Sequence, residues 1–308
     1  MTEYALAIDL GGTKIEAALV SRAGVVEASG RSRRPTGRDI DPATLTAAVA
    51  AVTAEAIAAL PAGSMLVGAG IGSAGPIDFR TEQIFPVNMP GVRGFGLAES
   101  ARTALRAHGY DVPVRQRHDG GCIALGESWK GATAGARASM SIIVSTGLGG
   151  GVVIDGNVIG GASGNAGHIG QVAAPAGFDV PEFAGVPTVE DVVSGPASVR
   201  WARAQGWQGA QGEDLGRDAA AGDEIARAAI ERSARGVGIV LADAATLIDL
   251  EVIAVGGGFS HVSPDYVSLV EAALRAAAAL PYSQATRVVR AGLGGDAPLV
   301  GAAALVLA

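Results

Sequence analysis

The chain has 308 residues, of which 49% are hydrophobic, so it is long enough for about two domains with buried cores. Its net charge of −7 argues against nucleic-acid binding, because a protein that neutralises phosphates along a strand needs a basic surface. The single cysteine, Cys122, excludes an intrachain disulfide and a cysteine-rich zinc site, which is typical of a protein in the reducing cytoplasm.

The N-terminal segment shows no targeting signal. Residues 1–10 carry Glu3 and Asp9, and they lack the basic start and apolar core of a secretory signal. No stretch approaches the ~18 uninterrupted apolar residues that a membrane-spanning helix needs. We therefore expect a soluble, cytoplasmic protein with no membrane partner.

Apolar runs separated by short turns predict three antiparallel strands at the start of the chain. The first run begins at Tyr4, and the turns are Gly11-Gly12-Thr13 and Arg22-Ala23-Gly24. The elements expected next are a helix over 42–60 capped by Asp41, a buried strand over 65–71, a helix over 97–108 and a strand over 112–116.

The second half repeats the opening theme after a helix that begins at Asp119. An apolar run over 141–144 leads into a glycine-rich turn over 145–151 and a second run over 152–154. Two matching hairpins suggest an internal duplication and a two-lobed fold with a cleft between the lobes. Helices over 223–247 and 264–280, with a strand over 252–255 between them, complete an α/β pattern.

The first turn, Asp9 to Lys14, has two readings. Its glycines can bring backbone N–H groups against a phosphate, while Thr13 adds a hydroxyl and Asp9 could hold Mg²⁺ through water. Alternatively it is an ordinary hairpin in which Gly-Gly only supplies positive φ. The motif alone does not decide between them.

Two further glycine clusters favour a nucleotide. The turn over 145–151 has more small residues than a two-residue hairpin requires, and a second phosphate site explains them. Gly256-Gly257-Gly258 follows a buried strand and offers a flat surface for an adenine, although a plain strand-to-helix turn is nearly as good a reading. Together the three clusters indicate nucleotide binding.

Three polar residues could contact or activate a substrate. Asp119 follows a strand and precedes a helix, so it could accept a hydroxyl proton as that oxygen attacks a γ-phosphate, or it could simply cap the helix. His168 lies in a glycine-rich polar segment and could equally be a solvated loop residue. Glu190 could bind a ligand or be a first-turn acid favoured by the helix dipole. His261 is expected to be a surface residue.

The order of these motifs resembles the ROK family (repressor, open reading frame, kinase) of bacterial sugar kinases and regulators, over nearly the full length. The motifs that carry the resemblance are Asp9 to Lys14, Gly72 to Pro76, Asn88, Asp119, Ser145 to Gly151, Ala166 to Gly170, Glu190 and Gly256 to Gly258. The resemblance implies an actin-like (ribonuclease H-like) two-domain ATPase fold. We expect a smaller lobe over residues 1–118, completed by a C-terminal helix over 297–308, and a larger lobe over 119–296.

The resemblance also implies roles for individual residues, with Asp119 as the catalytic base. The residues expected to bind MgATP are Asp9, Gly11, Gly12, Thr13, Lys14, Thr146, Gly147, Gly149, Gly150, Gly256, Gly257 and Gly258. The residues expected to bind the sugar are Gly75, Asn88, His118, Asp119, His168, Gln171 and Glu190. Repressor members carry an added DNA-binding domain, which we do not expect here because the first hairpin starts at Tyr4.

The chain departs from the family pattern in its sugar site. His118 replaces the usual Asn before the base, and His168 and Gln171 replace the usual Glu and His. The same exchange of Glu for His is found in the N-acetylmannosamine kinase branch, and an imidazole can donate to an acetamido carbonyl where a carboxylate cannot.

The family's zinc ligands are absent as well. Gln171 stands at the position of the histidine ligand, and Pro181, Phe183 and Thr188 stand at the three cysteine positions. A structural zinc site needs about four such ligands, so we expect a zinc-free member of the family.

These observations predict an ATP-dependent sugar kinase that phosphorylates the primary hydroxyl of a hexose or N-acetylhexosamine. The alternative is a non-catalytic sugar sensor or pseudokinase, suggested by His118, Gln171 and the missing zinc ligands. A repressor is disfavoured by the acidic charge and the missing DNA-binding domain. The family suggests a homodimer.

Overall fold

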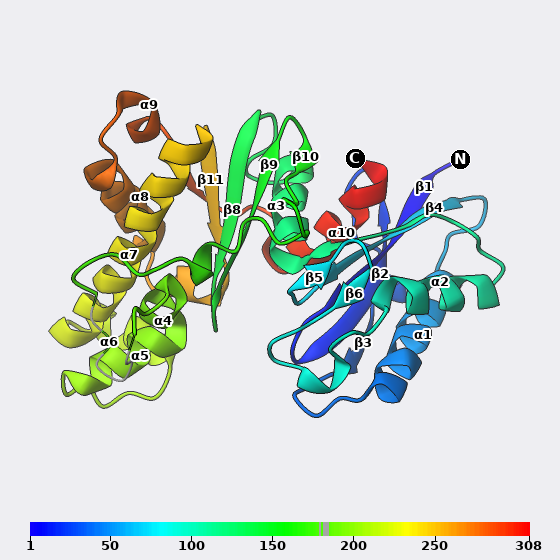
Figure 1. Ribbon diagram of the computed structural model, residues 1–308, viewed down its shortest axis with the longest axis horizontal. Coiled ribbons are helices and arrows are strands. Elements are labelled where there is room, and N and C mark those ends of the chain that lie inside the picture. The colour runs from blue at the N-terminus through cyan, green and yellow to red at the C-terminus, as the bar shows by residue number, and fades with distance from the viewer. Residues whose placement is uncertain (179, 181–184) are drawn as a thin grey trace. The chain divides into compact units, whose positions relative to one another are not determined.

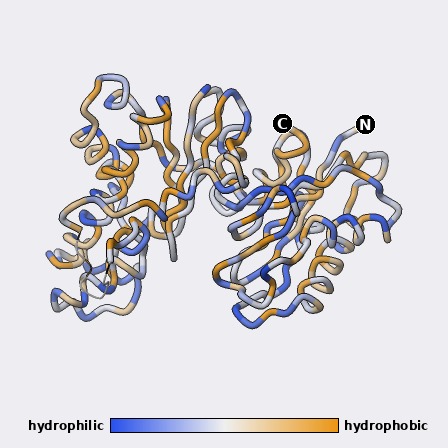
Figure 2. Tube along the Cα trace, viewed as in Figure 1, coloured by the Kyte–Doolittle hydropathy of each residue, from blue (hydrophilic) through white to orange (hydrophobic). Residues whose placement is uncertain are grey.

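The computed structural model describes residues 1–178, 180 and 185–308 (Figure 1). The chain forms two compact units. Unit 1 comprises Met1–Gly135, Gly151–Gly167 and Gly295–Ala308, and unit 2 comprises Ala136–Gly150 and His168–Gly294. Hydrophobic residues concentrate along the central strands, where most side chains are buried (Figure 2).

The sheet of unit 1 has the strand order β3-β2-β1-β4-β7. Strand β1 (Glu3–Leu10) pairs antiparallel with β2 (Lys14–Ser21) and parallel with β4 (Met65–Ser73), which pairs parallel with β7 (Val114–His118). The predicted third strand begins later than expected, because β3 is Ser32–Pro35 and the residues after Gly24 form only an isolated bridge between Val20 and Val26.

Helices cover both faces of this sheet. Alternate residues of β1 point to opposite sides, so Leu6 and Ile8 join the core formed with α1 (Pro42–Ala58) and α2 (Leu97–Ala107), whereas Ala5 and Ala7 join the core formed with α10 (Ala297–Leu307). The Asp41 carboxylate accepts a hydrogen bond from Thr44 N, 2.7 Å away, and so caps α1 as predicted.

Small residues let α10 lie close to β4 and to α3 (Asp119–Lys130). A Cβ atom on Gly70 would lie 1.7 Å from the Ala302 carbonyl oxygen, and one on Gly301 would lie 1.8 Å from that of Cys122. This close packing groups α3 with unit 1. The division therefore differs from the expected lobes over 1–118 and 119–296, and unit 1 holds more residues than unit 2.

A short hairpin and a docked loop complete unit 1. Strands β5 (Ile77–Asp78) and β6 (Gln83–Ile84) pair antiparallel. The Asn165 side chain accepts from Ile77 N at 2.9 Å and donates to Ile77 O at 2.7 Å, which holds the loop before His168 against β5. The 3-10 helices of unit 1 are η1 (Ala28–Gly30), η2 (Pro90–Val92) and η5 (Gly294–Asp296), whose first residue belongs to unit 2.

The second sheet has the strand order β10-β9-β8-β11-β12. Strands β8 (Ala138–Val144) and β12 (Arg287–Arg290) both pair parallel with β11 (Val252–Gly256). Strand β9 (Leu148–Ile154) follows the glycine-rich turn and pairs with β10 (Asn157–Val158).

The helices of unit 2 are α4 (Val189–Val193), α5 (Gly195–Ala204), α6 (Gly212–Ala220), α7 (Glu224–Ile248), α8 (Tyr266–Ala277) and α9 (Pro281–Gln284). Two 3-10 helices, η3 (Ile169–Gln171) and η4 (Gly258–His261), lie in its loops. Helix α7 packs against α8, α6, α5 and α4. Within the described residues, no helix is long and apolar enough to cross a membrane.

Candidate active site

The carboxyl ends of three parallel strands meet at one edge of the unit 1 sheet. In the strand register Asp9 lies beside Gly72, and Leu10 lies beside Ser73, which in turn pairs with His118. The base candidate, Asp119, is the next residue along the chain. The topology therefore brings the first glycine hairpin and Asp119 to the same edge of the sheet, where ligands of α/β proteins commonly bind.

The first hairpin does not need its glycines for the fold. Neither Gly11 nor Gly12 has a positive φ, which contradicts the reading that they only supply left-handed backbone. A Cβ on Gly11 would meet only Lys14 O, at 3.6 Å, and one on Gly12 would meet Asn88 at 3.5 Å, both ordinary contacts. Neither φ nor packing therefore requires glycine at these two positions, and Asn88 lies beside Gly12.

Asp9 and Asp119 influence one another electrostatically. The removal of water around the Asp9 carboxyl, with help from the negative charge of Asp119, raises the pKa of Asp9 to about 7 although Lys14 opposes the shift. Two neighbouring carboxylates suit a divalent cation, since a cation would offset their repulsion.

His118, and not Asp119, caps helix α3. Its Nδ1 accepts a hydrogen bond from Gly121 N at 3.2 Å, and its Nε2 donates to the Ala166 carbonyl at 3.0 Å. Asp119 is the first helical residue, and its Oδ1 accepts from Gly120 N at 2.7 Å. The alternative prediction that Asp119 caps the helix is therefore wrong. A sugar hydroxyl could reach either nitrogen of the buried His118 ring only by displacing one of these partners.

Gly75, the other sugar candidate of unit 1, lies in the turn after β4, and its peptide bond to Pro76 is cis. This turn is tied to the first hairpin, because Ala74 N donates to Leu10 O at 2.7 Å. Gly75, Asn88, His118 and Asp119 thus belong to unit 1, whereas His168, Gln171 and Glu190 belong to unit 2.

The second hairpin is held from both sides within unit 2. Ser145 N donates to Gly147 O at 2.9 Å, and Gly195 N donates to Ser145 O at 2.9 Å. Leu148 N donates to a carboxylate oxygen of Glu190 at 2.7 Å. Gly149 has no positive φ, and a Cβ there would meet nothing within 4 Å, so the fold does not require this glycine either.

The sugar-loop candidates of unit 2 lie against this hairpin. A Cβ on Gly170 would lie 2.1 Å from Leu148 O, so η3 packs directly on β9. Gln171 at its end donates weakly to the second carboxylate oxygen of Glu190, at 3.4 Å, and His168 precedes its first residue. The structure thus brings Gln171 and Glu190 together, with His168 three residues away in the chain.

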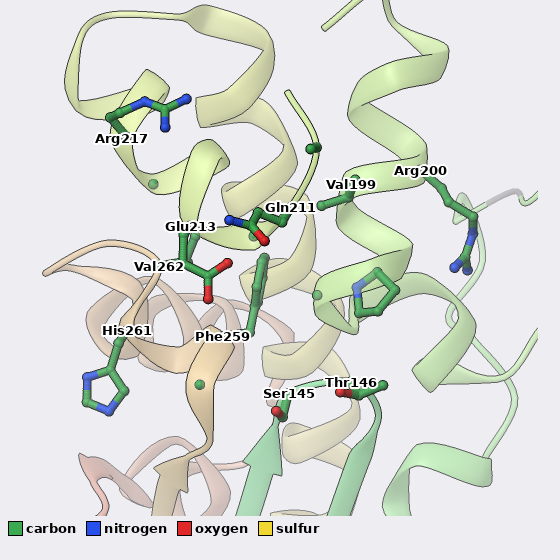
Figure 3. A pocket seen from close by; sticks show the side chains of 16 residues that line it. Ser145, Thr146, Val199, Arg200, Gln211, Glu213, Arg217, Phe259, His261 and Val262 are labelled. Carbon is green, nitrogen blue, oxygen red and sulfur yellow. The ribbon is translucent and has the colours of Figure 1, made fainter. Parts of the chain in front are cut away.

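A pocket of about 740 Å³ opens beside the second hairpin, and it lies wholly within unit 2. Of the predicted nucleotide residues, Thr146 (Figure 3) and Gly258 line it. Phe259 stands within it, near Gln211 and Glu213. Ser145, the first residue of the predicted turn, lines it as well. The lining residues that belong to no predicted motif are Gly195, Pro196, Val199, Arg200, Ala210, Gln211, Gly212, Glu213, Gly216, Arg217, Phe259, His261 and Val262.

The glycine triplet divides into two structural roles. Gly256 ends β11, and Gly257 has φ 92° and no room for a side chain, because a Cβ would lie 2.4 Å from Val144 O. Gly258 differs, since a Cβ there would meet only Ser145 Oγ, at 3.8 Å. The triplet is therefore a strand-to-helix turn of which Gly258 reaches the pocket.

Backbone pairing holds the segment where the family has its zinc. Ala174 N donates to Pro187 O at 2.8 Å, and Val189 N donates to Val172 O at 2.9 Å. Thr188 stands where the family has one of its cysteine ligands, and it forms a reciprocal cap of α4 with Asp191. Pro181 and Phe183 lie outside the described residues. Within the residues that the structure does describe, no group of three or more His, Cys, Asp or Glu side chains is arranged to hold a metal.

The two sheets and their glycine hairpins define an actin-like two-domain ATPase, as predicted. The chain belongs to the ROK family, whose family model matches residues 5–308 and confirms the resemblance seen in the motifs. It is 33% identical to the N-acetylmannosamine kinase of Escherichia fergusonii, over 97% of both chains.

Two solved structures of the ROK family are similar to this chain over nearly its whole length. The ROK hexokinase from Thermus thermophilus has a TM-score of 0.82 and 31% identity, over 98% of this chain and 97% of that one. A ROK family glucokinase from Streptomyces griseus, solved in complex with glucose and AMPPNP, has a TM-score of 0.78 and 27% identity, over 98% of this chain and 99% of that one.

Proposed function

We propose that this protein is an ATP-dependent sugar kinase that phosphorylates the primary hydroxyl of a hexose or N-acetylhexosamine. The observation that carries the proposal is that Gly11, Gly12, Gly149 and Gly258 sit where neither φ nor packing requires glycine. Glycines of this kind permit close approach of a ligand to the backbone. The similar proteins are named as sugar kinases, which supports a sugar kinase activity for this chain.

The nucleotide has a suitable pocket in unit 2. A volume of about 740 Å³ fits a ligand of nucleotide size, and Phe259 provides an apolar surface for a base. Thr146 at the start of the second hairpin lines the same pocket, so a nucleoside bound there has phosphate-binding backbone beside it. Mg²⁺, held through water by Asp9, would neutralise charge on the phosphates.

Asp119 has the chemistry of the base. In the proposed reaction its carboxylate accepts the hydroxyl proton while the sugar oxygen forms a bond to the γ-phosphorus. The bond from that phosphorus to the β-phosphate oxygen breaks, and ADP leaves. Because His118 caps α3, Asp119 is not needed for the cap.

The sugar is proposed to contact Gly75, Asn88, Asp119, His168, Gln171 and Glu190. His168 can donate to an acetamido carbonyl, and we therefore favour N-acetylmannosamine over glucose. His118 is proposed to act on the sugar site through Ala166 and not by direct contact. We further propose that the protein works as a homodimer in the cytoplasm.

The experiment is a coupled assay of ADP release with glucose, mannose, N-acetylglucosamine and N-acetylmannosamine. Sugar-dependent ADP release, with a phosphorylated product detected by mass spectrometry, is the expected result. Sugar and ATP binding without turnover for every member of the panel would instead identify a sugar sensor or pseudokinase.

A further inference from the structure

Glu190 contacts the proposed phosphate hairpin more closely than it contacts the sugar loop. Its Oε2 accepts the Leu148 backbone N–H at 2.7 Å, whereas its Oε1 is 3.4 Å from the side-chain nitrogen of Gln171. The first contact is charge-assisted and therefore stronger than a neutral hydrogen bond. Glu190, which is expected to bind sugar, thus also supports the proposed phosphate hairpin through Leu148.

The Glu190 carboxylate lies directly against the hairpin at Gly147. A Cβ on Gly147 would lie 2.3 Å from Glu190 Oε2, so the carboxylate occupies the space that a side chain at this position would need. The bond to Leu148 N fixes the peptide plane between Gly147 and Leu148. It therefore sets the direction of the neighbouring peptide groups at the tip, which are the groups proposed to face the phosphates.

Glu190 is itself held firmly. It lies in the first turn of α4, behind the reciprocal cap formed by Thr188 and Asp191. At the end of α4, Ser194 N donates to Glu190 O at 3.3 Å, and the next residue, Gly195, donates to Ser145 O at 2.9 Å. Residues 188–195 thus hold the hairpin at both Ser145 and Leu148.

We infer that Glu190 is a positioning residue for the nucleotide: it orders the phosphate hairpin before any sugar binds. The inference rests on the proposed function. Since its other oxygen faces Gln171, a sugar that donates a hydroxyl to Glu190 restrains the same carboxylate that holds the hairpin. Sugar binding should then tighten nucleotide binding, and by linkage nucleotide should tighten sugar binding.

The test is the affinity for Mg-AMPPNP, measured by calorimetry first without sugar and then with saturating N-acetylmannosamine. Glu190→Ala should weaken sugar-free binding by about tenfold, the usual effect of losing a charged hydrogen bond. Glu190→Gln keeps an oxygen that can accept from Leu148 N, so most of the affinity should return. The sugar-induced tightening should disappear in Glu190→Ala. Glu224→Ala, at the first-turn acid of α7, is the matched control and should behave as the parent.

Opposite outcomes are distinguishable. If Glu190 is only a sugar contact, Glu190→Ala binds Mg-AMPPNP as tightly as the parent, or more tightly because one negative charge near the phosphates is gone, and the inference fails. Hydrogen exchange at the Leu148 amide of the ligand-free protein adds a readout that needs no ligand, and it should accelerate in Glu190→Ala. Unchanged exchange would also overturn the inference, whereas a parent that binds no nucleotide would overturn the proposed function instead.

Discussion

His118 Nε2 donates a hydrogen bond to the carbonyl oxygen of Ala166, 3.0 Å away, and thereby ties the residue before the proposed base to the loop that leads into His168. The other ring nitrogen caps α3. One buried side chain therefore sets both the start of the helix that carries Asp119 and the position of the loop.

Replacing His118 separates these two tasks. His118→Asn keeps an oxygen that can cap α3 but is too short to reach Ala166, whereas His118→Ala loses both contacts. We expect His118→Ala to lower stability by about 1–2 kcal/mol and His118→Asn by less. Thermal unfolding measures this order, and an Asn variant less stable than the Ala variant would contradict the assigned cap.

The raised pKa of Asp9 predicts a pH-dependent cost to folding. The folded-state pKa of about 7 lies above the ordinary value of 3.8, so the folded chain binds a proton more tightly than the unfolded chain. The contribution of the protonated Asp9 carboxyl to the free energy of unfolding is fully present below about pH 4, and it is lost as the pH rises through 7. Asp9→Asn should therefore melt higher than the ligand-free parent at pH 8, and the difference should fade towards pH 4.

The same variant should bind MgATP poorly, because Asn cannot supply the charge proposed to hold Mg²⁺. Calorimetry at pH 8 with and without Mg²⁺ checks this second effect. A parent that melts higher than Asp9→Asn at pH 8 would show that the Asp9 carboxylate is stabilising and would contradict the pKa assignment.

Gly149→Val should weaken nucleotide binding while leaving the fold intact. The new side chain starts in open space and at an ordinary φ, so the melting temperature should stay near that of the parent. It would nevertheless stand where phosphates are proposed to approach, so the Kd for Mg-AMPPNP should rise at least tenfold, with little change in sugar binding. Equal losses for both ligands would argue against a phosphate site at this hairpin.

His168→Glu tests the preferred sugar. A carboxylate accepts hydrogen bonds but cannot donate one to an acetamido carbonyl. The ratio of kcat/KM for N-acetylmannosamine to that for glucose should therefore fall, by about tenfold for one lost hydrogen bond. An unchanged ranking across the sugar panel would remove the reason for favouring an N-acetylated substrate.

The elements that carry local signals were predictable from sequence. The hairpin at Gly11-Gly12, helix α1 with its Asp41 cap, and the long helix α7 all follow from turn residues and apolar periodicity. The order of the glycine motifs was specific enough to indicate the family and its fold.

Contacts made by the tertiary fold were not predictable in this way. Glu190 on Leu148 N and the placing of α3 with unit 1 through α10 join residues far apart in the chain. His118 caps α3 from only three residues away, but histidine is not among the residues that usually fill a cap position. Phe259 and Gln211 reach the unit 2 pocket from separate elements and carry no motif. Asp119 illustrates the difference, because its sequence position suits a helix cap, whereas the structure shows His118 in that role.

The central claim is that Asp119 is the base of a sugar kinase, and Asp119→Asn tests it most directly. Asn has nearly the same size and can accept from Gly120 N, but it cannot take up the hydroxyl proton. With saturating sugar and ATP, kcat should fall by about 10²-fold or more, while the melting temperature and the affinity for Mg-AMPPNP stay near those of the parent. A kcat close to the parental value, on protein with an unchanged melting temperature, would contradict the assignment of Asp119 as the base.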